Sequence, residues 1–179
     1  MAEIQVRPAI ESDLPYLTAI DHRYRTEYVW QLDVGMSPTQ IDVAFRRTRL
    51  PRATRQDYPR DPETLKKNWR KRTGLLVAVH ENKPLGYISL EHSIIPATAQ
   101  ATDLAVSVPW RRKGIGTALI LAAQDWTEHH HCRQLFLEMQ SKNYPAITLA
   151  MKLGYEYCGY SDRYYLNQDI ALFFSKSLR

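Results

Sequence analysis

A basic, glycine-containing turn between an expected strand and an expected helix constrains the fold of this chain most. Residues 101–108 are predicted to form the strand, and residues 111–116 (Arg-Arg-Lys-Gly-Ile-Gly) follow almost at once. Apolar side chains then recur at spacings of four, three and four, which predicts a helix with one buried face. These are Ile115, Leu119, Ala122 and Trp126, after which Leu135, Leu137 and Met139 alternate as the next strand.

The other segments continue this alternation of strands and helices. Residues 4–8 are predicted as a strand, 14–20 and 62–72 as helices, and 75–91 as an antiparallel hairpin. A further helix begins at Pro145 and ends at Gly154, and a last apolar run covers residues 170–174. A chain of this length forms one ordinary domain. We therefore expect residues 1–179 to fold as a single α/β (α+β) domain.

Residues 31–62 carry a weaker pattern. Prolines at positions 38, 51, 59 and 62 interrupt regular structure, and a strand is indicated only around Ile41, Val43 and Phe45. We expect this part to be the most irregular of the chain.

The turn at residues 111–116 has the properties of an anion-binding site. The first N–H groups of a helix lack intrahelical acceptors, and the helix dipole places partial positive charge there. Gly114 and Gly116 let the main chain approach a diphosphate, because neither carries a side chain. The glycine spacing alone fits neither a dinucleotide fingerprint nor a P-loop, so the surrounding motifs must identify the ligand.

Those motifs resemble the GNAT superfamily of acyl-CoA N-acyltransferases in order and spacing. They are Asp103-Leu104-Ala105-Val106, Arg111-x-x-Gly114-x-Gly116, Leu137-Glu138-Met139-Gln140, Asn143-x-x-Ala146 and Leu153-Gly154-Tyr155. The resemblance covers about residues 75–175, and the tail through residues 169–174 is similar to the streptothricin acetyltransferase branch. It implies a mixed, mostly antiparallel sheet of six to seven strands, splayed at its centre and flanked by helices.

The resemblance also implies acetyl-CoA as the acyl donor, bound where the strand ending near Val106 splays from the strand ending near Met139. The amides of residues 112–117 would bind the pyrophosphate, Asn143 would meet the pantetheine arm, and the Val106 N–H would support the thioester oxygen. The residues implied in donor binding are Leu104, Ala105, Val106, Arg111, Arg112, Lys113, Gly114, Ile115, Gly116, Thr117, Asn143 and Ala146.

An amine acceptor must lose its proton before it attacks, so a base is useful. Glu138 is the first candidate, because the alternating pattern places it with Phe136 on the face away from Leu135, Leu137 and Met139. Glu138 could equally bind a backbone group or the substrate ammonium. Asp103 is the second candidate, although a structural hydrogen bond within the sheet explains it better.

The departing thiolate benefits from a proton donor. Many members of the superfamily place a tyrosine where this chain has Ala150, so the usual acid is missing. Tyr144 is our candidate replacement, with Tyr155 and Tyr160 as alternatives, although such aromatic residues more often pack than react.

The acceptor is expected to be a primary amine of a small, antibiotic-like molecule. Tyr28, Trp30 and Asp33 fall in a helix-to-loop stretch that commonly lines the acceptor site in this superfamily, and rings with a carboxylate suit a cation. Two alternatives stay open, namely protein N-acetylation and an acyl-CoA-binding regulatory module that lost transfer activity.

The net charge of +5 does not by itself indicate nucleic acid. Residues 46–60 hold six arginines against one acid, Asp57, and no nucleic-acid motif accompanies them, so a solvated patch is the simpler interpretation. His129, His130 and His131 cannot converge on one metal ion from a helix, so no metal is expected. Cys132 and Cys158 are expected to be reduced and packed. We expect a cytoplasmic protein without a membrane span, and count a homodimer among the candidate assemblies.

Overall fold

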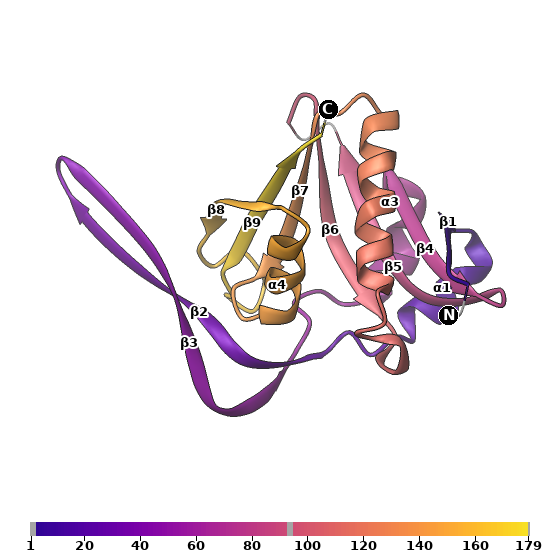
Figure 1. Cartoon of the computed structure of the whole chain (residues 1–179), viewed down its shortest axis with the longest axis horizontal. Coiled ribbons are helices and arrows are strands. Elements are labelled where there is room, and N and C mark those ends of the chain that lie inside the picture. Colours follow the sequence, from indigo (N-terminus) through magenta and orange to yellow (C-terminus); the bar gives the residue numbers. More distant parts are fainter. Residues whose placement is uncertain (1–2, 93–94, 179) are drawn as a thin grey trace.

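The computed structural model describes residues 3–92 and 95–178, and its main body is a seven-stranded sheet (Figure 1). The sheet order is β1-β4-β5-β6-β7-β9-β8. All neighbouring strands are antiparallel except β6 and β7, which are parallel. The strands are β1 (Gln5–Pro8), β4 (Gly74–His80), β5 (Lys83–His92), β6 (Thr98–Val106), β7 (Gln134–Gln140), β8 (Glu156–Ser161) and β9 (Ala171–Ser177).

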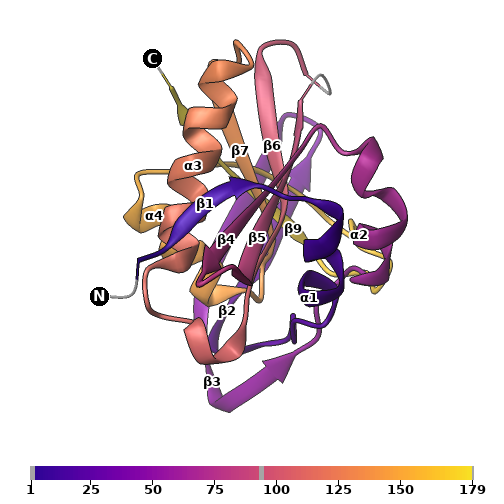
Figure 2. The same ribbon diagram turned by 90° about the vertical axis from the view of Figure 1, so that its right-hand side faces the viewer.

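Helices cover both faces of this sheet (Figure 2). On one face, α3 (Ile115–His129) and α4 (Tyr144–Lys152) bury the larger apolar cluster, which includes Leu119, Leu135 and Ile147. On the other face, α1 (Leu14–Thr18) and α2 (Glu63–Asn68) cover a smaller cluster around Leu17 and Tyr87. Short 3-10 turns, Glu11–Asp13, Trp69–Lys71 and Val108–Trp110, complete the helical segments. The predicted mixed, mostly antiparallel sheet flanked by helices is confirmed.

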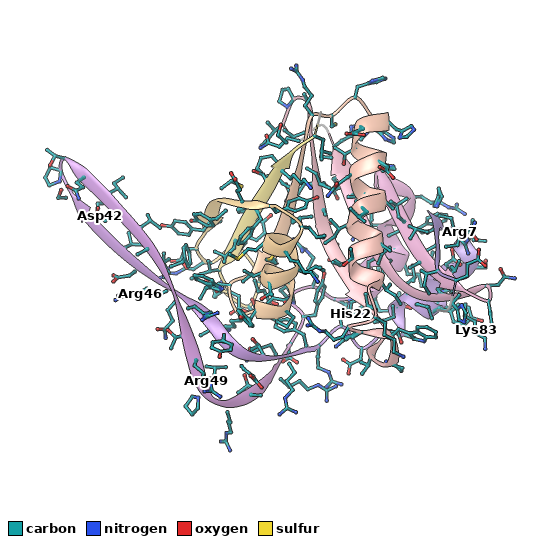
Figure 3. All side chains as sticks on the ribbon, viewed as in Figure 1. Arg7, His22, Asp42, Arg46, Arg49 and Lys83 are labelled. Carbon is teal, nitrogen blue, oxygen red and sulfur yellow. The ribbon has the colours of Figure 1, made fainter. Side chains whose placement is uncertain are left out.

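The predicted irregularity of residues 31–62 is wrong for most of that segment. β2 (Tyr24–Ser37) and β3 (Gln40–Gln56) form a long antiparallel hairpin separate from the main sheet. Its outer part projects away from the body, with Asp42 near the tip and Arg46 and Arg49 further along the same strand (Figure 3). Pro51 is accommodated because the register shifts between Thr26 and Tyr28, which leaves a bulge in the facing part of β3.

Tyr28, Trp30 and Asp33 therefore lie on a strand, not in the expected helix-to-loop stretch. Two smaller differences concern the end of the chain. Residues 156–161 form the edge strand β8, which the aromatic pattern did not predict. Cys158 on that strand is exposed, contrary to the expected packing, whereas Cys132 is buried.

Candidate active site

A β-bulge opens the sheet at its centre. β6 and β7 are paired only from Thr98↔Gln134 to Ala101↔Leu137. At the last of these pairs, the register of β6 against β5 shifts, because Leu90 faces Ala101 but Ser89 faces Asp103. The extra residue, Thr102, bends β6 away from β7. We call the resulting opening, between residues 102–106 of β6 and 138–140 of β7, the splay.

The bulge also decides which groups face the splay. Ala101 belongs to the core beneath α3, whereas Ala105 belongs to the core beneath α1 and α2, so the buried face of β6 changes at Thr102. Ser107 N–H donates to Leu85 O of β5 (2.7 Å). The backbone groups of Leu104 and the Val106 N–H therefore point the other way, into the splay, whereas Val106 O accepts from Arg111 Nε. Unpaired backbone groups inside a domain need partners, so this edge can receive an extended chain that carries amides.

A narrow cavity of about 50 Å³ lies in the splay. It has room for a thin chain or a few waters and is too small for an antibiotic-sized acceptor. The residues that line it include Arg60, Asp103, Leu104, Glu138, Asn143, Ala146 and Tyr165.

The amino end of α3 lies at the end of the predicted turn. Gly114 is the N-cap residue with φ +85°, and no side chain caps the helix there. A Cβ on Gly114 would meet nothing within 4 Å, so the space in front of the helix is open. The first turn of α3 carries no acidic residue that would occupy its positive end. These features fit a bound phosphate group, which uncapped amides at a helix start recognise.

Positions 114 and 116 favour glycine for different structural reasons. Gly114 adopts a left-handed backbone conformation that favours glycine, whereas a Cβ on Gly116 would lie 3.1 Å from Leu149 Cδ2 of α4. Gly116 therefore lets α3 and α4 approach each other, and its close approach to a diphosphate stays a prediction.

The Arg111 side chain is engaged by backbone carbonyls. Its Nε donates to Val106 O (2.8 Å), one terminal nitrogen to Arg23 O (2.7 Å), and the other to Asp21 O. Arg111 thus fastens the segment before β2 to the end of β6. Arg111 was predicted to contact the cofactor. Its guanidinium could make that contact only by giving up these hydrogen bonds.

Asn143 caps α4, since its Oδ1 accepts from the Ala146 N–H (3.1 Å). Both residues line the cavity, as the sequence motif suggested. The Asn143 side-chain NH₂ remains the group with which it could meet a ligand.

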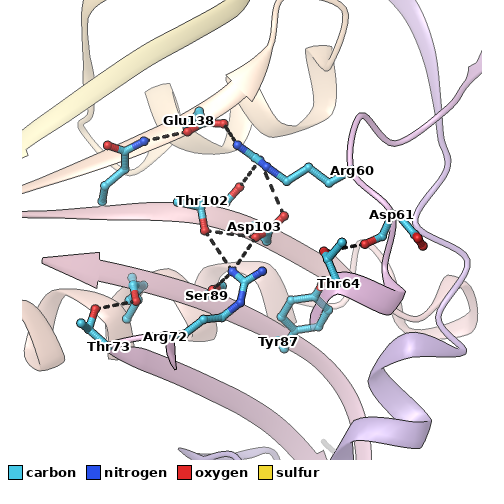
Figure 4. Close-up of polar contacts among 12 residues, drawn as sticks. Arg60, Asp61, Thr64, Arg72, Thr73, Tyr87, Ser89, Thr102, Asp103 and Glu138 are labelled. Atoms are coloured by element: carbon cyan, nitrogen blue, oxygen red, sulfur yellow. Dashed lines mark hydrogen bonds and ion pairs between the residues drawn. The ribbon is translucent and has the colours of Figure 1, made fainter. Parts of the chain in front are cut away.

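A buried charged network closes the other side of the splay (Figure 4). Arg60, from the segment between β3 and α2, forms ion pairs with Glu138 of β7 and, at 3.7 Å, with Asp103 of β6. It also donates to Thr102 O (2.8 Å). The Glu138 side chain is 0% exposed and that of Asp103 5%. Arg60 therefore bridges the two strands where they diverge.

Further donors saturate both carboxylates. Glu138 Oε2 accepts from Gln100 Nε2 (2.6 Å) and from the Tyr164 hydroxyl (3.0 Å). Asp103 accepts from the Tyr58 hydroxyl (2.5 Å) and pairs with Arg72 (3.0 Å).

These carboxylates affect the pKa values of their neighbours. Burial, reinforced by the Asp103 charge, raises the pKa of Tyr58. Burial lowers the pKa of Arg60, but the Glu138 and Asp103 charges outweigh it, so the net shift is upward. The positive charge of Arg60 is therefore held more firmly than that of a free guanidinium.

Sequence reasoning missed Arg60, Tyr58 and Arg72. Arg60 was counted among the arginines of a solvated patch, and no local pattern separates it from the other five. Its burial depends on the path of the segment that leads from the hairpin to α2.

None of the three tyrosine candidates for the acid is among the residues that line the cavity. The Tyr144 ring packs at a tilt against Tyr28, with the ring centroids 4.8 Å apart, and its hydroxyl accepts from Arg47 (3.2 Å). Tyr155 is buried and accepts from Gln124 (3.1 Å), and burial raises its pKa to about 12. Tyr160 packs at 5.3 Å against Phe45 of the hairpin.

Two of the predicted acceptor residues, Trp30 and Asp33, line a second, open groove of about 750 Å³ at the base of the hairpin, and Tyr28 is not among its lining residues. Trp30 N–H donates to Ser141 O (3.0 Å), which ties the hairpin to the end of β7. The Trp30 indole N–H is buried without a partner among the described residues. Asp33 is exposed and pairs with Arg46 (2.6 Å). Tyr28 lies beside Tyr144, and Arg47 covers its ring at 4.9 Å.

Within residues 3–92 and 95–178, no group of three or more His, Cys, Asp or Glu side chains could hold a metal ion. No helix in that part of the chain is long and apolar enough to cross a membrane.

Comparison with known proteins agrees with this geometry. A streptothricin acetyltransferase of Streptomyces lavendulae is 24% identical over 162 residues, 90% of this chain and 86% of the relative. An N-alpha-acetyltransferase of Saccharolobus solfataricus is 28% identical over 113 residues, 57% of this chain and 68% of the relative. A solved structure of a Bacillus anthracis str. Ames protein in complex with acetyl coenzyme A superposes with a TM-score of 0.77. It is 19% identical and covers 98% of this chain and 100% of that one.

The splayed sheet and the uncapped amino end of α3 define an acyl-CoA-dependent acyltransferase fold. Residues 43–155 match the acetyltransferase (GNAT) family, and the chain belongs to that family. It is an acetyl-CoA-dependent N-acetyltransferase, and the coenzyme is its acyl donor.

Proposed function

We propose that this enzyme acetylates a primary amine of a small, cationic, antibiotic-like molecule of the streptothricin type. The observation that carries the proposal is the pair of buried carboxylates, Asp103 and Glu138, on the two strands that diverge around the cavity. Both carboxylates are paired with arginine in the free protein, and a cationic group of the acceptor that displaced Arg60 would take its place between them. The similarity to a streptothricin acetyltransferase over most of both chains supports this acceptor class.

Donor binding is assigned to the splay and to the turn before α3. The amides at residues 112–117 would hold the phosphates, and the edge formed by Leu104, Ala105 and Val106 would hold the amide-bearing arm with Asn143 and Ala146 beside it. Arg112, Lys113 and Gly114 are exposed at this end, so positive side chains flank the site. Acetyl-CoA, when bound, supplies the thioester that an amine attacks directly. The Val106 N–H is the donor that we assign to the developing negative oxygen.

The role of Glu138 follows from its partners. For an amine with a pKa of ~10.4, deprotonation near pH 7 costs roughly 4 to 5 kcal/mol. Glu138 can lower this cost as a base, directly or through water, only if the acceptor displaces one of its donors. Arg60 is the donor most suited to displacement, because it is itself a cation on a connecting segment and 28% of its side chain is exposed. Asp103 would then form an ion pair with a second cationic group of the acceptor.

The test is a thiol-release assay with acetyl-CoA and a panel of streptothricin-type antibiotics, aminoglycosides, simple polyamines and short peptides. We expect turnover with a small cationic amine. Glu138→Gln should lower the rate at limiting amine while acetyl-CoA affinity stays nearly unchanged. Glu156→Gln, an exposed carboxylate on β8, is the control and should match the parent. Unchanged turnover in Glu138→Gln, with the melting temperature retained, would remove Glu138 from the mechanism.

A protein or peptide α-amine is the second candidate acceptor, favoured by the similarity to an N-alpha-acetyltransferase. The same panel separates the two, since peptide turnover without small-amine turnover would overturn the first proposal. A chain that binds acetyl-CoA but releases no thiol with any amine would instead be a regulatory module, the alternative suggested by Ala150.

A further inference from the structure

The outer part of the β2–β3 hairpin, from Leu32 to Phe45, has one apolar face. Residues opposite each other in an antiparallel pair share a face, and the pairs Leu32↔Phe45, Val34↔Val43 and Met36↔Ile41 alternate on both strands. The other face carries Asp33, Gly35, Ser37, Gln40 and Asp42. The hairpin is therefore amphipathic out to its tip.

Only the inner part of this apolar face is covered by the chain itself. Phe45 lies 5.8 Å from Tyr157 and 5.3 Å from Tyr160 of β8, and it packs against the main core. Beyond Phe45, the same face projects from the body (Figure 1). Its four outer side chains are exposed, with Val34 at 47%, Met36 at 82%, Ile41 at 67% and Val43 at 42%. A two-stranded ribbon alone is marginally stable in water, and packing of its apolar face against another layer stabilises it.

We propose that a second copy of this chain covers this face, through an isologous contact between the two projecting hairpin ends. We call the four outer side chains the arm patch. An isologous interface requires a patch that is complementary to itself, and two equal ribbon faces match in length and width. Packed face to face, they would bury the arm patches of both copies between two layers of strands.

The distribution of charge favours a second copy over a nucleic acid or an acidic protein. Around the arm patch the net charge is small, since Asp33 pairs with Arg46 and leaves the single charge of Asp42, which accepts from the neutral Gln40 on the opposite face. The strongly basic part of β3, from Arg47 to Arg55, lies nearer the base of the hairpin. Two arms related by a twofold axis can meet at their ends and keep these basic parts apart, whereas an anionic partner would bind at the base and leave the arm patch exposed.

The size of the patch sets the expected strength. A stable interface buries about 800 Å² on each partner. The arm patch alone is smaller than this, so the contact must extend along the same face toward Tyr157, which is 47% exposed beside Phe45. We therefore expect a dimer with a dissociation constant of about 1 to 10 μM.

Sedimentation velocity tests the proposal over a range of about 1 to 100 μM protein. The parent should shift from monomer to dimer as the concentration rises. Met36→Asp should stay monomeric throughout, with at least about a tenfold weaker association. Ser37→Asp is the control, because it adds the same charge one residue further on, on the opposite face, and should dimerise like the parent.

A parent that stays monomeric over the whole range would overturn the proposal, and so would a dimer that Met36→Asp leaves intact. The melting temperature of Met36→Asp should equal that of the parent monomer, because Met36 makes no contribution to the core. Thiol release with acetyl-CoA should persist in Met36→Asp, which separates loss of the dimer from failure of the proposed enzymatic function.

Discussion

Replacing Arg60 with methionine should destabilise the fold strongly, although Arg60 lies in a connecting segment. The substitution keeps the length of the apolar stem and removes the positive charge between Glu138 and Asp103. Asp103 would retain Arg72 at 3.0 Å and the Tyr58 hydroxyl. Glu138 would keep only neutral donors, Gln100, Tyr164 and Tyr165. The variant therefore leaves one fully buried carboxylate without a cation.

The magnitude follows from the burial of the pair. Removing one partner of a buried ion pair costs about 3 to 5 kcal/mol, because the other charge remains desolvated. The Arg60 side chain is 28% exposed, so water can approach and the lower end of about 3 kcal/mol applies. In a chain of this size, each kcal/mol lowers the melting temperature by roughly 2 to 4 °C, so a decrease of about 6 to 12 °C is expected.

Thermal unfolding followed by circular dichroism measures this effect. Arg49→Met is the matched control, since Arg49 is exposed on β3 and its loss should change the melting temperature little. In the double variant Arg60→Met/Glu138→Gln no buried charge is left unpaired. Its unfolding free energy should therefore exceed the additive expectation by at least about 1.5 kcal/mol. An Arg60→Met melting temperature within about 2 °C of the parent would refute the reasoning, because the pair would then contribute almost nothing to stability.

Two further predictions concern buried side chains that touch neither the cavity nor the hairpin tip. His22 bonds Ile20 O (2.7 Å) and the Tyr87 hydroxyl (2.9 Å), and burial lowers its pKa. The folded state therefore keeps His22 neutral, so stability present above pH ~6.5 should fall as the pH drops below it, by at most about 1.4 kcal/mol per pH unit. In His22→Gln, the unfolding free energy measured by urea titration should depend less on pH between neutral and mildly acidic conditions. An unchanged pH dependence would mean that groups other than His22 cause it. Tyr155→Phe should keep full turnover and lose about 1 kcal/mol of unfolding free energy with the Gln124 bond, whereas a tenfold slower thiol release would make Tyr155 the acid.

The elements predicted from the sequence are those that local signals determine. The strand before the turn, α3 and α4 each have their own periodicity and end signals, such as Pro145 and the left-handed Gly154. The sequence did not predict the long hairpin, because its prolines indicate interruptions of regular structure. Pro38 lies at the turn and Pro51 beside a bulge, two places where a strand pair tolerates proline.

Residues of the candidate site could be predicted only where a sequence motif fixes their position relative to a strand, turn or helix. The turn, Asn143 and the two carboxylates could be located because each sits at a fixed distance from an element boundary. The partners of those carboxylates could not, since Arg60 is 78 residues from Glu138 along the chain and Arg72 is 31 from Asp103. Such contacts depend on tertiary packing, which neither composition nor spacing encodes.

Calorimetric titration with acetyl-CoA tests the central claim most directly, when run on the parent together with Gly114→Asp and Gly114→Asn. Both variants carry a similar backbone strain at φ +85°, which Asn and Asp adopt more readily than other non-glycine residues, and only aspartate adds a negative charge at the open end of α3. The account predicts binding by the parent, near-parental binding by Gly114→Asn, and at least about tenfold weaker binding by Gly114→Asp. Equal affinity of the two variants for acetyl-CoA would mean that the phosphates do not bind at the start of α3. If the parent showed no heat of binding, the assignment of acetyl-CoA as the donor would be contradicted.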